Sequence, residues 1–261
     1  MGLTQSIQHG AMPARDFTAE RLARVAAMER WHFWFIGRQA LVGRLIERYV
    51  ERSDRPVVDI GCGTGAWIEQ LGRQGYLALG LDRRPEGLTV ARRTTPGLWL
   101  VQAEALQLPL REGAAAAVTL LDVLEHVDDD RALLAEVARL LREDGVALIT
   151  VPALPWLWSH RDEAAGHKRR YTKRTLVRRL TEAGFAVEKV RHYQFFLFPL
   201  VLAARWLGRK RPSVSDLEER PHQIINTLLG WINLLEARLA DVIAWPWGSS
   251  LVVVSRKRRD D

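Results

Sequence analysis

A glycine-rich stretch and an acid that follows it are the residues of this chain best suited to hold a ligand. The stretch from Val57 to Gly65 reads VVDIGCGTG, an apolar strand that leads into three glycines at every second position. Glycines let the backbone bend tightly and let a ligand approach without a Cβ in the way. A later apolar strand ends at Asp82, whose carboxylate can accept both hydroxyls of a ribose. With the N–H groups of the helix start that follows, these features predict a pocket for a nucleoside with a polar tail.

The elements that must position these residues alternate between strand and helix from residue 55 onward. The candidate strands are 57–60, 76–82, 98–102, 116–121 and 145–151. The clearest helix is 129–142, whose leucines and valine follow the helical period and which a turn at 143–145 ends. Such alternation predicts parallel strands with helices on both faces, and ligands beyond the carboxyl ends of the strands. Asp59, Asp82, Glu104 and Asp122 all fall at those ends.

The composition of the chain fits a soluble enzyme. Its 261 residues make one large domain or one domain with a small addition, and 48% hydrophobic residues supply a sizeable core. A single cysteine excludes a disulfide framework and argues against a thiolate metal site. The start of the chain lacks an apolar signal region, and no apolar run is long enough to span a bilayer. We therefore expect a cytoplasmic protein.

The net charge of +7 is concentrated locally. Residues 160–180 contain eight lysines and arginines against two acids, and shorter basic runs lie at 205–211 and 256–259. A basic cluster beside a pocket suits an anionic substrate, and basic residues beside apolar helices suit an anionic membrane surface. A solvated face explains any one of these charges equally well.

Taken together, the motifs resemble those of the class I S-adenosylmethionine-dependent methyltransferases. The resemblance rests on residues 59–65, 81–82, 103–110 and 121–127, and it covers roughly residues 55 to 155. The glycines are spaced Gly-x-Gly-x-Gly, and Ala66 stands where a dinucleotide-binding motif would have its last glycine, which favours this family over a dehydrogenase. The resemblance implies an α/β fold with a Rossmann-like, doubly wound sheet of seven strands, and S-adenosylmethionine as the cofactor.

The resemblance also implies how the cofactor is held. Gly61 and Gly63 would face its methionine part, Asp59 would organise the turn, and Asp82 would hold the ribose. Glu104 would accept a hydrogen bond from the adenine amine, and the Ala105 N–H would donate to a ring nitrogen. Leu121 and Asp122 would line the end that carries the methyl group. The full set of expected cofactor residues is Trp34, Arg38, Asp59, Gly61, Cys62, Gly63, Gly65, Asp82, Arg83, Glu104, Ala105, Leu121, Asp122 and Val123.

Ahead of this core, residues 31–38 are unusually aromatic and resemble the leading segment of a bacterial branch of the family. Trp34 or Phe35 could cover the cofactor, and Arg38 could pair with its carboxylate through two hydrogen bonds. Alternatively, residues 38–50 form an amphipathic helix that caps the sheet. Both interpretations can hold together.

The segment 152–172, after the fifth strand, resembles the same branch and is expected to contact the methyl acceptor. A loop of this length in a compact domain is usually functional. Its prolines and tryptophans would form an apolar wall, and Thr172 would cap a helix that begins at Lys173. Metal binding by the histidines with Asp162 or Glu163 is opposed by the neighbouring arginines, so no metal is expected. We expect His126, His167 and Tyr171 as catalytic residues and Trp156, His160, Arg169 and Arg170 as substrate-binding residues, although His126 could simply complete a helix start.

Two apolar helices are expected between a sixth strand, 185–193, and the last strand, 250–255. They could form a lid whose apolar pocket is roofed by Phe196, Leu200, Trp231 and Leu235, lie on a membrane, pair in a homodimer, or add to the core. The predicted divisions are an N-terminal helical cap (1–54), the methyltransferase core (55–194), the helical insertion (195–248), and the last strand with a basic tail (249–261).

The sequence thus predicts methyl transfer to oxygen, nitrogen or carbon of a small or lipid-linked molecule with an apolar body and an anionic or hydroxyl group. A nucleic-acid methyltransferase is the rival enzyme, but the Asn/Asp-Pro-Pro-Tyr motif of such enzymes is absent, since the fourth strand ends in Leu-Leu-Asp-Val. A non-catalytic protein that binds a membrane surface is the alternative from another class.

Overall fold

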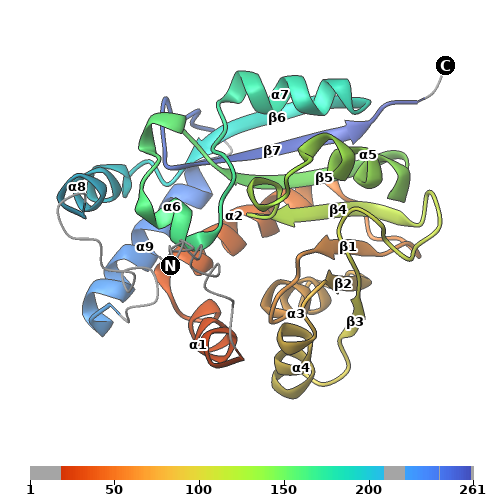
Figure 1. Cartoon of the computed structure of the whole chain (residues 1–261), viewed down its shortest axis with the longest axis horizontal. Helices are drawn as coiled ribbons and strands as arrows, with labels where there is room; N and C mark the ends of the chain where they lie inside the picture. Colours follow the sequence, from red (N-terminus) through yellow and green to blue (C-terminus); the bar gives the residue numbers. More distant parts are fainter. Residues whose placement is uncertain (1–18, 209–220, 241, 260–261) are drawn as a thin grey trace, which may run out of the picture.

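A seven-stranded sheet forms the centre of the protein in the computed structural model, which describes residues 19–208, 221–240 and 242–259 (Figure 1). The strand order is β3-β2-β1-β4-β5-β7-β6, and β7 runs antiparallel to both of its neighbours. The strands are β1 (Val57–Ile60), β2 (Ala78–Asp82), β3 (Trp99–Gln102), β4 (Ala115–Leu121), β5 (Leu141–Pro152), β6 (Phe185–Tyr193) and β7 (Ser250–Lys257). The predicted seven-stranded α/β sheet is therefore confirmed, and β6 and β7 form an antiparallel pair.

Helices cover both faces of the sheet. They are α1 (Ala19–Glu29), α2 (Phe33–Tyr49), α3 (Ala66–Arg73), α4 (Pro85–Thr94), α5 (Asp130–Leu140), α6 (His160–Ala165), α7 (Lys173–Glu182), α8 (Phe198–Gly208) and α9 (Gln223–Leu239), with short 3-10 turns η1 (Leu124–His126) and η2 (Pro155–Leu157). Buried side chains of α5 and α7 join one core cluster, and those of α2, α3 and α9 join a second one. Strands β1 and β4 are buried along their whole length because they lie in the middle of the sheet.

Helix α5 starts close to its predicted position but ends earlier. The Asp129 carboxylate caps it by accepting hydrogen bonds from the backbone N–H groups of Arg131 and Ala132, at 3.1 and 3.0 Å. Leu141 was expected to be helical but pairs with Ala115 as the first residue of β5. The predicted turn at 143–145 lies within a bulge of β5, because the register with β4 passes from Leu141 directly to Val146 and Asp144 has a φ of 58°.

Helix α2 includes most of the aromatic segment and begins five residues before the predicted start at Arg38. His32 caps it, because its Nδ1 atom accepts a hydrogen bond from the Trp34 N–H at 3.3 Å. Leu41, Leu45 and Ile46 are buried in the second core cluster. The interpretation of this segment as an amphipathic helix that caps the sheet is confirmed.

Helix α9 packs against α2 with its polar face inward. Asn226 binds the backbone of Trp31 and Phe33 at 2.7 and 3.0 Å, and Asn233 donates to the Phe33 carbonyl at 2.9 Å. The opposite face of α9 is an apolar stripe that remains exposed to solvent. We call it the α9 stripe; it consists of Ile224, Leu228, Trp231 and Leu235. The insertion is thus helical as predicted, and of the alternatives considered for it, the addition of this stripe to the core is excluded because the stripe faces outward.

The basic run at 256–259 does not accompany the apolar helices as expected, whereas Arg205 of the other run belongs to α8. Arg256 pairs with Glu188 and Arg259 with Asp144, at the C-terminal end of β7, which lies far from α8 and α9 (Figure 1). Residues 209–211 lie outside the described residues. Across the described ranges, no helix combines the length and apolar character that a membrane crossing requires.

A single buried carboxylate, Asp162, holds the segment after β5 in place. Its Oδ1 atom binds Arg170 Nε at 2.8 Å and His167 Nδ1 at 3.0 Å, and its Oδ2 atom binds Arg205 Nη1 at 2.6 Å. Burial alone would raise the pKa of Asp162, but the hydrogen bonds from His167 and Arg205 and the charge of Arg170 lower it below its usual range. Arg170 also donates to the Ala153 carbonyl at 2.6 Å. Asp162 therefore ties α6, α8 and the chain after β5 into one unit.

Replacing Arg170 by alanine should destabilise the protein by about 3 kcal/mol, because removal of one partner leaves a buried charge less well compensated. Urea unfolding of both forms measures this difference. The matched control is Arg174→Ala, an exposed arginine of α7, which should stay within about 0.5 kcal/mol of the wild type. Equal stability of the two variants would contradict a structural role for Arg170.

Candidate active site

The carboxyl ends of β1 and β2 are joined by hydrogen bonds around the glycine turn. The backbone N–H groups of Gly61 and Cys62 donate to the Leu81 carbonyl at 2.7 and 3.0 Å. The Gly63 N–H donates to Asp82 Oδ2 at 2.9 Å, and the Arg84 N–H donates to Asp82 Oδ1 at 2.8 Å. Because each carboxylate oxygen has two acceptor positions, Asp82 fixes the turn and keeps acceptor capacity for a ligand.

The three glycines of the turn all have positive φ angles, of 79°, 54° and 80°. A Cβ on Gly61 would lie 2.6 Å from Val123 Cγ2, and one on Gly65 would lie 2.9 Å from Leu98 Cδ1. A Cβ on Gly63 would meet no protein atom within 4 Å. Gly61 and Gly65 are therefore needed for packing, whereas Gly63 borders open space that a ligand can use.

Asp59 lies in β1 beneath the turn and is buried. Its Oδ1 atom accepts a hydrogen bond from Thr119 Oγ1 at 2.6 Å. Burial raises the pKa of Asp59 to about 7, and the hydrogen bond from Thr119 offsets only part of that effect. Cys62 is also buried, which raises the pKa of its thiol, so this residue is a small neutral filler of the turn.

Arg38 reaches the end of β4 from α2. Its Nη1 atom lies 2.6 Å from Asp122 Oδ2 and 3.4 Å from the Leu121 carbonyl oxygen. Asp122 also accepts from Thr150 Oγ1 at 3.1 Å, and its φ of 58° is unusual for a residue other than glycine. The Arg38 Nε atom is buried and has no hydrogen-bond partner among the described residues. Arg38 was expected to bind a cofactor carboxylate, and its pair with Asp122 could not be predicted from the motifs.

Helix α1 covers the glycine turn, which the motifs did not predict. Glu29 accepts a hydrogen bond from Thr64 Oγ1, and Arg30 pairs with Glu69 of α3 at 2.6 Å. Burial raises the pKa of Glu29, against the opposing effects of Thr64 and Arg38. No spacing pattern in the sequence links Glu29 to Thr64, because the two residues meet only in the folded chain.

The remaining expected cofactor residues lie around the ends of β2 and β3 and at the start of α2. Glu104 is exposed in a tight turn, closed by the Gln107 N–H that donates to its carbonyl at 3.0 Å. Ala105 packs against the first core cluster, and Arg83 is exposed with its carbonyl bound to Gln102 Nε2 at 3.1 Å. Trp34 is half-buried in the first turn of α2.

Two of the expected catalytic residues, His126 and His167, lie side by side. Their rings are 4.8 Å apart in an edge-to-face arrangement. Burial and the neighbouring His167 lower the pKa of His126 to about 4, so His126 is neutral at neutral pH. His167 is held through its Nδ1 atom by Asp162.

The third expected catalytic residue, Tyr171, faces the core. Only 2% of it is exposed, and its hydroxyl group donates to Asp130 Oδ2 at 3.0 Å. Burial and the nearby Asp130 raise its pKa. A catalytic role for Tyr171 is therefore wrong, because the side chain cannot meet an acceptor without leaving the core.

The expected substrate-binding arginines are also held by the protein itself. Arg170 is buried against Asp162, so its assignment to the substrate is wrong. Arg169 binds the Asp128 carbonyl at 2.7 Å and lies 3.3 Å from Asp130 Oδ2. Both side chains therefore stabilise the fold around α6 and α7.

Trp156 keeps a surface that a substrate could contact, whereas His160 is half-buried. Trp156 is 58% exposed, and its ring meets the Phe198 ring edge-on at 6.1 Å. His160 starts α6, and its buried Nε2 atom has no hydrogen-bond partner within the described ranges. These residues place an apolar surface between η2 and α8.

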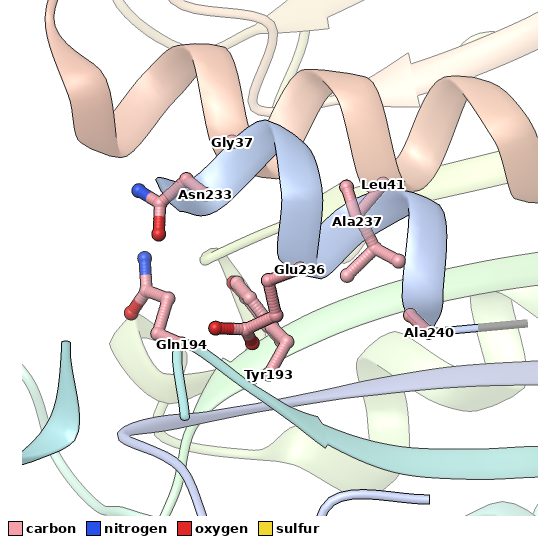
Figure 2. A pocket seen from close by; sticks show the side chains of 8 residues that line it. All are labelled: Gly37, Leu41, Tyr193, Gln194, Asn233, Glu236, Ala237 and Ala240. Carbon is pink, nitrogen blue, oxygen red and sulfur yellow. The ribbon is translucent and has the colours of Figure 1, made fainter. Parts of the chain in front are cut away.

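A small pocket lies between α2, α9 and the end of β6 (Figure 2). It is lined by Gly37, Leu41, Tyr193, Gln194, Asn233, Glu236, Ala237 and Ala240. Glu236 accepts hydrogen bonds from the backbone of Phe195 and Phe196, at 2.9 and 3.1 Å. This pocket lies on the inner side of α9, and no residue of the glycine turn lines it, so we place the candidate site at the strand ends.

Phe196, Leu200, Trp231 and Leu235, the side chains that a lid was expected to use as a roof, are all exposed in the described part of the chain. For Trp231 and Leu235 the reason is that α9 turns its polar side toward α2 and its apolar side outward. The structure therefore does not support an apolar pocket roofed by these four side chains.

Comparison with known proteins identifies the family of the chain. Residues 31–190, more than half of the chain, match the family model described as "Methyltransferase domain". A protein of Mycolicibacterium smegmatis named "Probable S-adenosylmethionine-dependent methyltransferase" is 28% identical over 181 residues, which are 68% of this chain and 68% of that protein. An uncharacterized methyltransferase of Mycobacterium tuberculosis is 31% identical over 152 residues, which span 58% of this chain but only 57% of that protein.

The fold is also found among solved structures. The phosphoethanolamine N-methyltransferase 2 of Haemonchus contortus, in complex with S-adenosyl-L-methionine, is similar with a TM-score of 0.64 and 16% identity. The similarity covers 96% of this chain and 61% of that one. The chain therefore belongs to the methyltransferase domain family, among the class I S-adenosylmethionine-dependent methyltransferases.

Proposed function

We propose that this protein transfers the methyl group of S-adenosylmethionine to a small or lipid-linked molecule with an apolar body and an anionic or hydroxyl group. The assignment of S-adenosylmethionine as the cofactor rests on one observation, the arrangement of Asp82 and Gly63 at the strand ends. The carboxylate keeps acceptor capacity there, and the position of a Gly63 Cβ is empty. These two features fit a ribose beside the methionine part of the cofactor.

The chain offers complementary groups to the rest of the cofactor. Asp82 would accept from the ribose hydroxyls, and the backbone around Gly63 would face the methionine part. The buried Nε of Arg38 is a donor that has no partner in the part of the chain that the structure describes, and it lies close to the residues that we expect at the methyl end. A carboxylate could bind it from the side, without breaking the pair between Arg38 and Asp122. Transfer of the methyl group then depends mainly on the alignment of acceptor and donor.

The residues that we expect near the methyl acceptor favour an apolar acceptor over a nucleic acid. The arginines that suggested anion binding are paired within the protein, Arg170 with Asp162 and Arg169 with Asp130. In contrast, Trp156 and the α9 stripe leave large apolar side chains exposed. Exposed apolar patches of this kind mark sites of contact with a lipid, a ligand or another protein.

Asp82→Ala should weaken S-adenosylmethionine binding by roughly 2–4 kcal/mol, because charge-assisted hydrogen bonds to the ribose are lost. Isothermal titration calorimetry with S-adenosylmethionine measures the change. The matched control is Glu86→Ala, which removes an exposed acid from the first turn of α4 and should leave the affinity unchanged. Binding of NAD, without binding of S-adenosylmethionine, would refute the proposed function.

Gly63→Ala tests the open space above the turn. The added Cβ meets no protein atom, so the free energy of unfolding should fall by only about 1–2 kcal/mol, because alanine is strained at a positive φ. The cofactor, in contrast, should bind at least tenfold more weakly. Gly97→Ala is the control, because Gly97 also has a positive φ (89°) and open space around its Cβ but lies in the turn before β3. Calorimetry and thermal unfolding separate the two effects, and equal cofactor affinity in both variants would place the cofactor elsewhere.

If the acceptor is linked to a lipid, the α9 stripe should bring the protein to a bilayer surface. We expect the protein to sediment with phosphatidylcholine vesicles, since each large apolar side chain that leaves water contributes about 2 kcal/mol. The double variant Leu228→Glu/Trp231→Glu should remain in the supernatant. Gln223→Glu, which adds a charge at an exposed position of α9 away from the stripe, should sediment like the wild type. A wild-type protein that never sediments would leave only the small-molecule acceptor.

A further inference from the structure

Glu125 is a carboxylate that the fold buries without satisfying it. Its side chain is 0% exposed, and neither of its oxygens has a hydrogen-bond partner among the described residues. Burial of a polar group without a partner is costly, and exceptions in native proteins commonly mark a function or a bound ion. Glu125 lies in η1, three residues after Asp122 at the end of β4.

Two histidines turn toward this carboxylate. The ligand atoms of Glu125, His126 and His167 all lie within 4.8 Å of one another, and His167 Nε2 is 4.0 Å from Glu125 Oε1. The His167 Nδ1 atom is bound to the Asp162 carboxylate at 3.0 Å. When Nδ1 carries the proton, Nε2 keeps its lone pair on the side of Glu125. A histidine that donates to a carboxylate in this way is the usual arrangement of a metal ligand.

His126 lies against His167, with ring centroids 4.8 Å apart, and the backbone of Gly166 acts on its ring by raising the pKa. The arginines around the cluster are already paired. Arg38 binds Asp122, and both Arg170 and Arg205 bind Asp162. The positive charge of these arginines is therefore largely compensated within the protein. It opposes the binding of a cation less than we expected from the sequence.

We propose that Glu125, His126 and His167 bind one divalent transition-metal ion at the end of β4. Two imidazole nitrogens and one carboxylate suit Zn²⁺, Fe²⁺ or Co²⁺, and three protein ligands leave a position open for another group. The ligand atoms of a tetrahedral zinc site lie about 3.3 Å apart, a distance estimated from the usual zinc–ligand bond lengths, so small rotations of these side chains suffice. No metal was expected from the sequence. The proposed site also differs from the metal site considered there, because His160 does not take part.

The ion would specify an oxygen acceptor, an inference that rests on the proposed methyl transfer. A hydroxyl group bound to a divalent ion loses its proton at a lower pH than the free hydroxyl does. The proton would pass to bulk water, and an oxygen lone pair would form the new bond to the methyl carbon. The bond between that carbon and the sulfonium sulfur would break, and its electrons would stay on sulfur in S-adenosylhomocysteine. The acceptors would therefore be alcohols, phenols or related hydroxyl compounds.

Titration of the chelator-treated protein with Co²⁺ tests the site, because Co²⁺ bound by nitrogen and oxygen ligands gives visible absorption bands that are sensitive to its coordination. We expect one equivalent of Co²⁺ to produce these bands in the wild type. Glu125→Gln, which is isosteric, and His167→Gln should each weaken the binding by tenfold or more. Glu163→Gln, an exposed acid of α6, and His222→Gln, an exposed histidine before α9, are the matched controls and should bind like the wild type.

Calorimetry with S-adenosylmethionine, carried out without metal, separates this proposal from the proposed function and shows that the variants are folded. Absence of Co²⁺ bands in the wild type, or equal bands in Glu125→Gln and His167→Gln, would overturn the metal site even when S-adenosylmethionine binds normally. Variant-sensitive Co²⁺ bands in a protein that binds no S-adenosylmethionine would support the metal site and refute methyl transfer.

Discussion

Two carboxylates neutralise the guanidinium groups that the fold encloses around the end of β4. The positions of α2, α8 and the chain after β5 depend on these two carboxylates. Asp122 holds Arg38, and through it α2, against the end of the sheet. Asp162 holds Arg170 and Arg205, which brings α8 and the chain after β5 to the same place. A guanidinium group cannot lose its proton, so each needs a fixed negative partner when it is buried. The aromatic and basic segments that flank the family core are thereby fixed at the candidate site.

The sheet and the glycine turn could be predicted from sequence because their signals are local. A buried parallel strand reads as an apolar run, and the residues of the turn adjoin it in the chain. The predicted strand 57–60 matches β1 residue for residue, and the other strands begin within a few residues of their predicted starts. The same holds for the Thr172 cap of α7, whose hydroxyl accepts from the Thr175 N–H at 3.1 Å.

The roles of polar side chains in the long segment could not be predicted in the same way. A tyrosine and two arginines in a basic, histidine-rich stretch indicate a binding surface, but Tyr171 and Arg170 point inward to Asp130 and Asp162. Which side a loop residue faces depends on partners brought together by folding. Glu125 is the reverse case, because it lies inside a motif that identifies the family. Only the structure shows that it is buried and that neither of its oxygens has a hydrogen-bond partner within residues 19–208, 221–240 and 242–259. Likewise, the helical period of α9 predicts a stripe but not which side of the helix packs.

The position of β7 has a consequence for the order in which the chain folds. This strand lies between β5 and β6, although it comes after both in the sequence and after the whole insertion. Both of its ladders must therefore form late, over a long sequence separation, which slows folding. During synthesis, β5 and β6 emerge from the ribosome while each still has an open edge. Such edges recruit strands from other molecules, so the insertion lengthens the period in which a nascent chain is exposed to aggregation.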